Sequence, residues 1–201
     1  MIEDTFDWFE KRLSRFGLVV IAGGAVRDSL MGRQPKDFDV FVLHDGRTKF
    51  KELKESISAQ LTDLETVVSD IEWHKSEPYL VASVIWRNQE VQVMANPAPC
   101  LSALVMGFDW NVCLFGYERD RYFHGEDTNN IGPGKELKLN KVTYPLSTLR
   151  RGFRFSERFL MRLRDEDLSL LCGKVKENVD KRRVTANEPD MPSLAANALP
   201  E

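Results

Sequence analysis

Hydrophobic and polar positions follow their clearest pattern between residues 18 and 43 of this chain. Residues 18–22, LVVIA, form a short β-branched apolar run, which predicts a buried strand. Two glycines and residues 25–31 follow, a stretch that suits a short helix ended by Gly32. After Pro35, residues 37–42, DFDVFV, predict a second strand. The pattern therefore predicts a strand, a glycine turn, a helix and a second strand in succession.

The second predicted strand carries two aspartates on one face. Successive strand side chains point to opposite faces, so Asp37 and Asp39 project together while Phe38 points toward a core. Two carboxylates roughly 7 Å apart on one face repel each other unless a cation lies between them. Hard oxygen ligands favour Mg²⁺ or Mn²⁺, so the pattern predicts a divalent-metal site. Taken alone, D-x-D is more often a pair of solvated aspartates after a turn.

The glycine turn adds chemistry that D-x-D alone lacks. Gly23 and Gly24 run into a helix N-terminus, where backbone N–H groups can approach a phosphate with the help of the helix dipole. Arg27, Arg33 and Lys36 add positive charge nearby. Metal-binding carboxylates beside a phosphate-binding turn predict metal-assisted phosphoryl or nucleotidyl transfer.

The remaining hydrophobic pattern predicts helices around a sheet. Apolar residues recur at helical spacing in residues 3–16 and 50–64, and they alternate or cluster as in strands in residues 79–86 and 90–95. Residues 87–89 predict the hairpin turn between those two strands. Turn signals in residues 119–143 predict an irregular or hairpin-like excursion, and helical patterns return from Pro145.

Composition limits the class of protein without identifying it. The 201 residues are 42% hydrophobic, enough for one good-sized core, and the net charge of −3 shows no overall basic character. Any nucleic-acid contact must therefore be local. Three scattered cysteines and three isolated histidines predict reduced thiols and no zinc site. Without a signal peptide or a long apolar segment, we expect a cytoplasmic protein with no membrane partner.

The motifs around the D-x-D strand resemble those of a known family. GGAVRD at residues 23–28, LMGR at 30–33 and PKDFDV at 35–40 are similar to the head-domain signature of the class II tRNA nucleotidyltransferases. That family comprises CCA-adding enzymes and bacterial poly(A) polymerases, within the polymerase-β-like nucleotidyltransferase superfamily. The resemblance implies an α+β head with a small mixed, mainly antiparallel sheet and flanking helices, followed by the start of a helical neck. It also implies Mg²⁺- or Mn²⁺-dependent transfer of NMP from an NTP to a 3′-hydroxyl of an RNA such as tRNA.

The family's third metal carboxylate has two candidate positions here. It lies in a Glu-Val pair on a later strand, which Glu90 and Val91 match. An alternative alignment places Gln92 at the carboxylate position. Both side chains lie on the same face of the predicted strand, so periodicity leaves the choice open. The resemblance thus implies catalytic, metal-binding roles for Asp37 and Asp39, with Glu90 as the candidate third ligand.

A second family motif is only partly present. The family has Arg-Arg-Asp before an apolar segment, and its Asp contacts the ribose of the incoming nucleotide. Asp109 matches that Asp, whereas Gly107 and Phe108 stand in place of the two arginines and Cys113 replaces an Asn. The resemblance implies a ribose contact for Asp109. The alternative is a capping Asp before a buried segment.

An arginine pattern resembles the neck helix of the family. Arg151, Arg154 and Arg158 fall at i, i+3 and i+7 on one helix face, and residues 150–164 hold six arginines against one glutamate. Arginine suits planar contacts to phosphate, so we expect nucleotide or RNA contact. The alternative is a solvated face with its stems packed on the core. The family's base-templating motif is not recognisable in residues 144–148.

The expected organisation is a nucleotidyltransferase head at residues 1–143, a helical neck-like segment at 144–185 and a disordered tail at 186–201. The resemblance covers roughly residues 17–163, less than half of a typical family member. Two other functions stay open. One is NMP transfer to a protein or small-molecule hydroxyl, and the other is a non-catalytic module that binds NTP or RNA.

Overall fold

A six-stranded sheet forms the centre of the molecule. The computed structural model describes residues 1–47, 49–62 and 80–187. The strand order is β3-β4-β2-β1-β5-β6, and among these neighbours only β2 and β4 run parallel. The prediction of a small mixed, mainly antiparallel sheet is therefore confirmed. The strands are β1 Leu18–Ala22, β2 Asp37–Leu43, β3 Leu80–Trp86, β4 Gln89–Asn96, β5 Phe115–Glu118 and β6 Arg121–His124.

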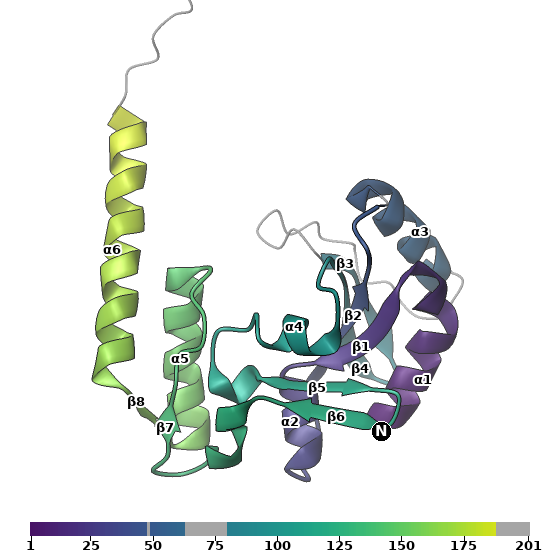
Figure 1. Cartoon of the computed structure of the whole chain (residues 1–201), viewed down its shortest axis with the longest axis horizontal. Helices are drawn as coiled ribbons and strands as arrows, with labels where there is room; N and C mark the ends of the chain where they lie inside the picture. The colour runs from purple at the N-terminus through teal and green to yellow at the C-terminus, as the bar shows by residue number, and fades with distance from the viewer. Residues whose placement is uncertain (48, 63–79, 188–201) are drawn as a thin grey trace, which may run out of the picture.

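Different helices cover the two faces of the sheet. Helices α1 (Ile2–Leu13) and α3 (Phe50–Thr62) lie together on one side, as Figure 1 shows, and α4 (Leu101–Val105) packs on the other. The alternating residues of β2 explain the division. Phe38 and Val40 belong to the core under α1 and α3, whereas Phe41 and Leu43 belong to the core under α4. Asp37 and Asp39 therefore lie on the α4 face of the sheet.

The turns predicted from sequence form where they were expected. Helix α2 (Gly24–Leu30) connects β1 to β2, and Gly32 follows it with a φ of 66°, as expected of a glycine just past a helix end. Arg87 and Asn88 have φ values of 48° and 63°, which fit the tight turn between β3 and β4. The predicted excursion after residue 119 begins with the β5–β6 hairpin and continues through the 3₁₀ helix η3 (Glu126–Asn130).

Helices α5 (Pro145–Phe159) and α6 (Asp165–Asn187) pack on each other at the far end of the molecule from α1 and α3 (Figure 1). They share a core with Trp110 and Val112, beside the 3₁₀ helix η2 (Asn111–Cys113). At Gly152 on α5, a Cβ atom would lie 2.5 Å from the Trp110 ring, so only glycine permits this close packing. The short strands β7 (Glu136–Leu137) and β8 (Arg162–Leu163) pair in parallel beside them.

The division into a head and a neck domain stays a prediction, since α5 and the Trp110 segment share one core. Residues 186 and 187 of the predicted disordered tail end α6, and residues 188–201 lie outside the described residues. In the described part of the chain, no helix combines the length and the apolar character needed to cross a membrane.

Candidate active site

The pairing of β2 with β4 brings the candidate metal ligands to neighbouring positions. Asp37 pairs with Glu90, and Asp39 pairs with Gln92 two residues further along both strands. All four side chains lie on the α4 face of the sheet, since each strand position two residues on returns to the same face. The sheet therefore presents three carboxylates and one amide together.

These carboxylates do not form a three-ligand cluster in this conformation. The Gln92 Nε2 atom donates a hydrogen bond to Glu90 Oε1 at 3.3 Å, and Glu90 is exposed at the rim. Within the described ranges, no group of three or more His, Cys, Asp or Glu side chains is arranged to hold a metal ion. The metal site of Asp37, Asp39 and Glu90 stays a prediction, and in this structure Glu90 turns toward Gln92. Asp37 and Asp39 are the hard-oxygen pair that fits a divalent cation, and the Gln92 side-chain oxygen is a neutral donor opposite Asp39.

The backbone of the glycine turn lies close to Asp39 of the D-x-D strand. Gly23 has a φ of 84°, and a Cβ atom there would lie 3.6 Å from Asp39 Oδ2. The Gly23 N–H donates to the Phe115 carbonyl at 2.8 Å, so this amide is already satisfied within the sheet. Phosphate binding by the turn of Gly23 and Gly24 stays a prediction, and in this structure the Gly23 amide is not free to take part. Gly24 is the first residue of α2, where N–H groups have no partner inside the helix.

Arg27 is a buried structural residue. Its side chain is 2% exposed and contacts Asp28 Oδ1 at 2.8 Å through both Nε and Nη2. Its Nη1 atom donates to the Val112 carbonyl at 3.0 Å, and its guanidinium lies 4.6 Å from the Phe159 ring centre. The sequence placed Arg27 on the triphosphate. In this structure its Nε, Nη2 and Nη1 atoms contact Asp28 and the Val112 carbonyl under α5, and its contact with a triphosphate stays a prediction.

Two of the three predicted neck arginines pair with buried carboxylates of the preceding segments. Arg158 Nη2 donates to Asp28 Oδ2 at 2.9 Å, so Asp28 receives two arginines. Arg151 Nη2 lies 2.6 Å from Asp109 Oδ2. These ion pairs hold α5 against α2 and against the segment before η2. Contact of Arg151 and Arg158 with phosphate stays a prediction, since each pair engages one Nη2 atom and both side chains keep exposed surface.

The Arg151–Asp109 pair leaves unused hydrogen-bonding capacity. Asp109 Oδ2 and Arg151 Nε are both buried, and neither forms a hydrogen bond with a described residue despite the close charge contact. Burial raises the pKa of the Asp109 carboxyl, and the charge of Arg151 lowers it without offsetting the burial. Because this oxygen is buried and lies beside Arg151 Nη2, the predicted ribose contact of Asp109 would require that contact to open.

Three predicted cations remain exposed. Arg154 lies on α5 between Arg151 and Arg158, is exposed, and forms no ion pair within the part of the chain that the structure describes. Arg33 and Lys36 are exposed in the loop before β2, and the Arg33 guanidinium lies 5.6 Å from the Phe159 ring centre. These three side chains can still reach a phosphate.

The pKa of the Cys113 thiol depends on burial and on the charges of Asp109 and Asp39. Burial raises the pKa of its thiol to about 12, the charges of Asp109 and Asp39 act in the same direction, and those of Arg27 and Arg151 oppose them. The thiol is therefore protonated at neutral pH and is no nucleophile.

Sequence reasoning missed Asp28. In the sequence, only its position directly after Arg27 indicated an ion pair. Its second partner, Arg158, lies 130 residues further along the chain, so no local pattern shows that contact.

Comparisons with known proteins relate part of this chain to a family model and its fold to solved structures. Residues 19–99 match the family model described as the poly A polymerase head domain. No curated protein matches the chain.

Several solved structures share the fold. An apo CCA-adding enzyme is 17% identical with a TM-score of 0.59, over 90% of this chain and 44% of that one. A CCA-adding enzyme in complex with ATP is 18% identical with a TM-score of 0.56, and the match covers 90% of this chain and 45% of that one. The Thermotoga maritima CCA-adding enzyme complexed with tRNA is 18% identical with a TM-score of 0.52, over 82% and 39%. At these identities the likeness shows the fold, and the chain spans less than half the length of these structures.

Proposed function

Because residues 19–99 form a head domain of the tRNA nucleotidyltransferase and poly(A) polymerase family, we propose that this protein transfers NMP from an NTP to an RNA 3′-hydroxyl. The observation that carries the proposal is the pair Asp37 and Asp39 on one face of β2, beside the Gly23 turn. A protein that only bound phosphate would gain nothing from two neighbouring carboxylates that repel it.

The transfer joins the 3′-oxygen of the acceptor to the α-phosphorus and breaks the bond from that phosphorus to the oxygen of the departing pyrophosphate. The proton of the acceptor hydroxyl is released. Asp37 and Asp39 would hold Mg²⁺ or Mn²⁺, which when bound supplies activation of the hydroxyl and neutralisation of phosphate charge. Glu90 would join them only after it releases the Gln92 amide, and the Gln92 oxygen is the neutral alternative.

The remaining residues would bind and orient the nucleotide. Arg33, Lys36 and Arg154 are the exposed cations for the triphosphate or the acceptor backbone, and the Gly24 N–H at the start of α2 would assist them. Asp109 would accept from a ribose hydroxyl only after Arg151 releases its Oδ2 atom. Arg27, Arg151 and Arg158 would act as positioning residues that hold α5 over the site.

The test is extension of labelled oligo-RNA or tRNA by NTPs in the presence of Mg²⁺ or Mn²⁺. Asp39→Asn keeps the side-chain shape and removes one charge, and we expect at least a hundredfold loss of transfer, about 2.7 kcal/mol in the barrier. Asp7→Asn, an exposed position on α1, is the matched control and should leave transfer unchanged. Wild-type protein that extends no RNA with either metal would contradict the proposal.

One observation favours a second candidate function, binding of NTP or RNA without turnover. An amide, Gln92, stands opposite Asp39, and the neighbouring Glu90 turns to that amide. Gln92→Glu would place a carboxylate opposite Asp39 and should tighten Mg²⁺ binding by about tenfold, as expected when one more anionic ligand is added. If wild-type protein binds NTP without transferring it and Gln92→Glu gains transfer, the binding function is the native one.

A further inference from the structure

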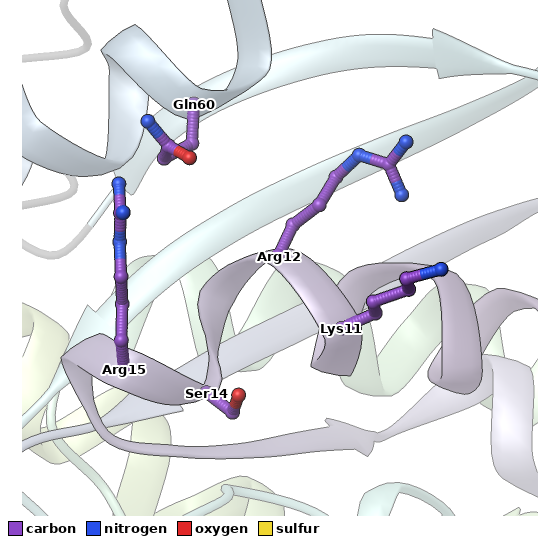
Figure 2. Close-up of a pocket in the computed structure, with 5 residues that line it drawn as sticks. All are labelled: Lys11, Arg12, Ser14, Arg15 and Gln60. Atoms are coloured by element: carbon purple, nitrogen blue, oxygen red, sulfur yellow. The ribbon is translucent and has the colours of Figure 1, made fainter.

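A second basic feature lies on the opposite side of the sheet from Asp37 and Asp39. A cavity of about 350 Å³ opens between the C-terminal end of α1 and the last turn of α3. Figure 2 shows Arg15 extending toward Gln60 from the other side of this gap. Helices α1 and α3 cover the face that holds Phe38 and Val40, whereas the aspartates face α4. The cavity is therefore separate from the candidate active site. It is lined by Lys11, Arg12, Ser14, Arg15 and Gln60.

The lining carries positive charge without a matching carboxylate. Three of its five residues are cations and none is acidic. None of the three forms an ion pair with a residue in the described ranges, and Glu10, their neighbour on α1, pairs with Arg119 at 2.7 Å. The ends of α1 and α3 contribute about half a negative charge each. Counted over the described residues alone, three cations outweigh these two partial charges at the cavity.

Aromatic rings hold both guanidinium groups in place. The Arg12 guanidinium lies 3.9 Å from the Trp8 ring centre, and its Nη1 donates to the Trp8 carbonyl at 3.3 Å. The Arg15 guanidinium lies 4.6 Å from the ring centre of Phe16. Stacking satisfies the faces of these groups and leaves most of their N–H edges available. A helix dipole accounts for Lys11 and Arg12 at the end of α1, and it gives no reason for Arg15 and Gln60 to line the same cavity.

We propose that this cavity is a phosphate-binding site, distinct from the nucleotidyl-transfer site. Planar guanidinium groups match phosphate oxygens with paired hydrogen bonds, and Ser14 and Gln60 supply neutral donors. The lining contains no aromatic or aliphatic side chain that would recognise a base, so charge dominates the binding. The phosphate can come from the backbone of an RNA strand outside the active site or from a free polyphosphate such as pyrophosphate.

The experiment measures equilibrium binding by the full chain without NTP, so its outcome is independent of transfer. Binding of a labelled single-stranded RNA is followed across a salt series, and pyrophosphate binding is followed by calorimetry. In the triple variant Lys11→Gln, Arg12→Gln and Arg15→Gln, loss of three phosphate contacts should lower the salt slope for RNA by about 2 units. The corresponding loss of affinity at moderate salt is about tenfold to a hundredfold.

A matched control removes the same charge elsewhere. Arg121→Gln, Lys135→Gln and Lys176→Gln neutralise three exposed cations outside the cavity, and this variant should keep the wild-type slope. Because Arg12 also packs on Trp8, the single variant Lys11→Glu tests the site at an exposed position, with an expected loss of about threefold to tenfold.

Each outcome either identifies the source of the bound phosphate, RNA or a free polyphosphate, or contradicts the proposed site. A lower RNA slope in the cavity variants alone places an RNA strand there. Loss of pyrophosphate binding in those variants, with RNA binding unchanged, places a free polyphosphate there. No difference from wild type for either ligand, or an equal loss in the control variant, overturns the proposal.

Discussion

The β2 strand and the α5 helix both carry charged motifs, and the structure uses the two motifs differently. On β2, Asp37 is exposed and Asp39 is half-buried, on the face that the sequence predicts. On α5, Arg151 and Arg158 pair with Asp109 and Asp28, and only Arg154 stays exposed without an ion pair in the described ranges. A short aspartate on a strand is confined to one face, whereas a long arginine can reach a partner that the sequence does not reveal. The position of an acidic strand motif is therefore easier to predict from sequence than the partners of a basic helix motif.

The largest expected effect breaks the buried network that holds α5. Asp28→Asn should lower the free energy of unfolding by about 3–5 kcal/mol, because it leaves the buried Arg27 without its counter-charge. Asp37→Asn, at an exposed position of the D-x-D strand, should change it by less than about 0.5 kcal/mol. Urea denaturation of both variants measures the difference. Equal losses would mean that Asp28 has no special structural role.

The contrast between these motifs also shows how far the sequence predicts this molecule. The face of Asp37 and Asp39 follows from alternation along one strand, and the end of α2 follows from Gly32, so both were predictable from neighbouring residues. The pairing of Asp39 with Gln92 depends on the register between two strands that are distant in sequence. Periodicity could not choose between Glu90 and Gln92 for this reason.

Ion pairs of the arginines were less predictable still. The Arg158–Asp28 and Arg151–Asp109 pairs form only when α5 packs against the head, and tertiary packing of this kind leaves no local pattern. The cavity between α1 and α3 was missed for the same reason. Lys11 and Arg12 read as the polar face of a helix until α3 brings Gln60 beside them.

A smaller effect, on RNA binding and stability, should distinguish the exposed Arg154 from the ion-paired Arg158. Arg154→Gln should lower the salt slope of RNA binding by about one unit and leave the free energy of unfolding within about 0.5 kcal/mol of wild type. Arg158→Gln should leave the salt slope unchanged and lower the free energy of unfolding, because the Arg158 guanidinium donates to Asp28 at 2.9 Å. RNA binding across a salt series, with denaturation of the same preparations, tests both. A lower slope in Arg158→Gln with unchanged stability would show that the Asp28 pair opens to bind RNA.

The smallest expected effect concerns the pH dependence of the Asp109–Arg151 pair. Burial raises the pKa of Asp109 in the folded state above the value of about 3.9 that it has in the unfolded chain. Between these two values the folded state binds more protons, so the stability that Asp109 contributes is full below about pH 3.9 and is lost as the pH rises through the folded pKa. The stability of wild type relative to Asp109→Asn should therefore fall with rising pH across this window.

Arg151→Gln sharpens that prediction, because it removes the charge that lowers the pKa of Asp109. In this background the loss of stability with rising pH should be larger and should extend to higher pH. Urea denaturation of wild type, both single variants and the double variant across a pH series gives the coupling between the two residues. If the stability of wild type relative to Asp109→Asn instead rises with pH, the arginine outweighs burial. Asp109 would then be an ordinary ion-pair partner of Arg151.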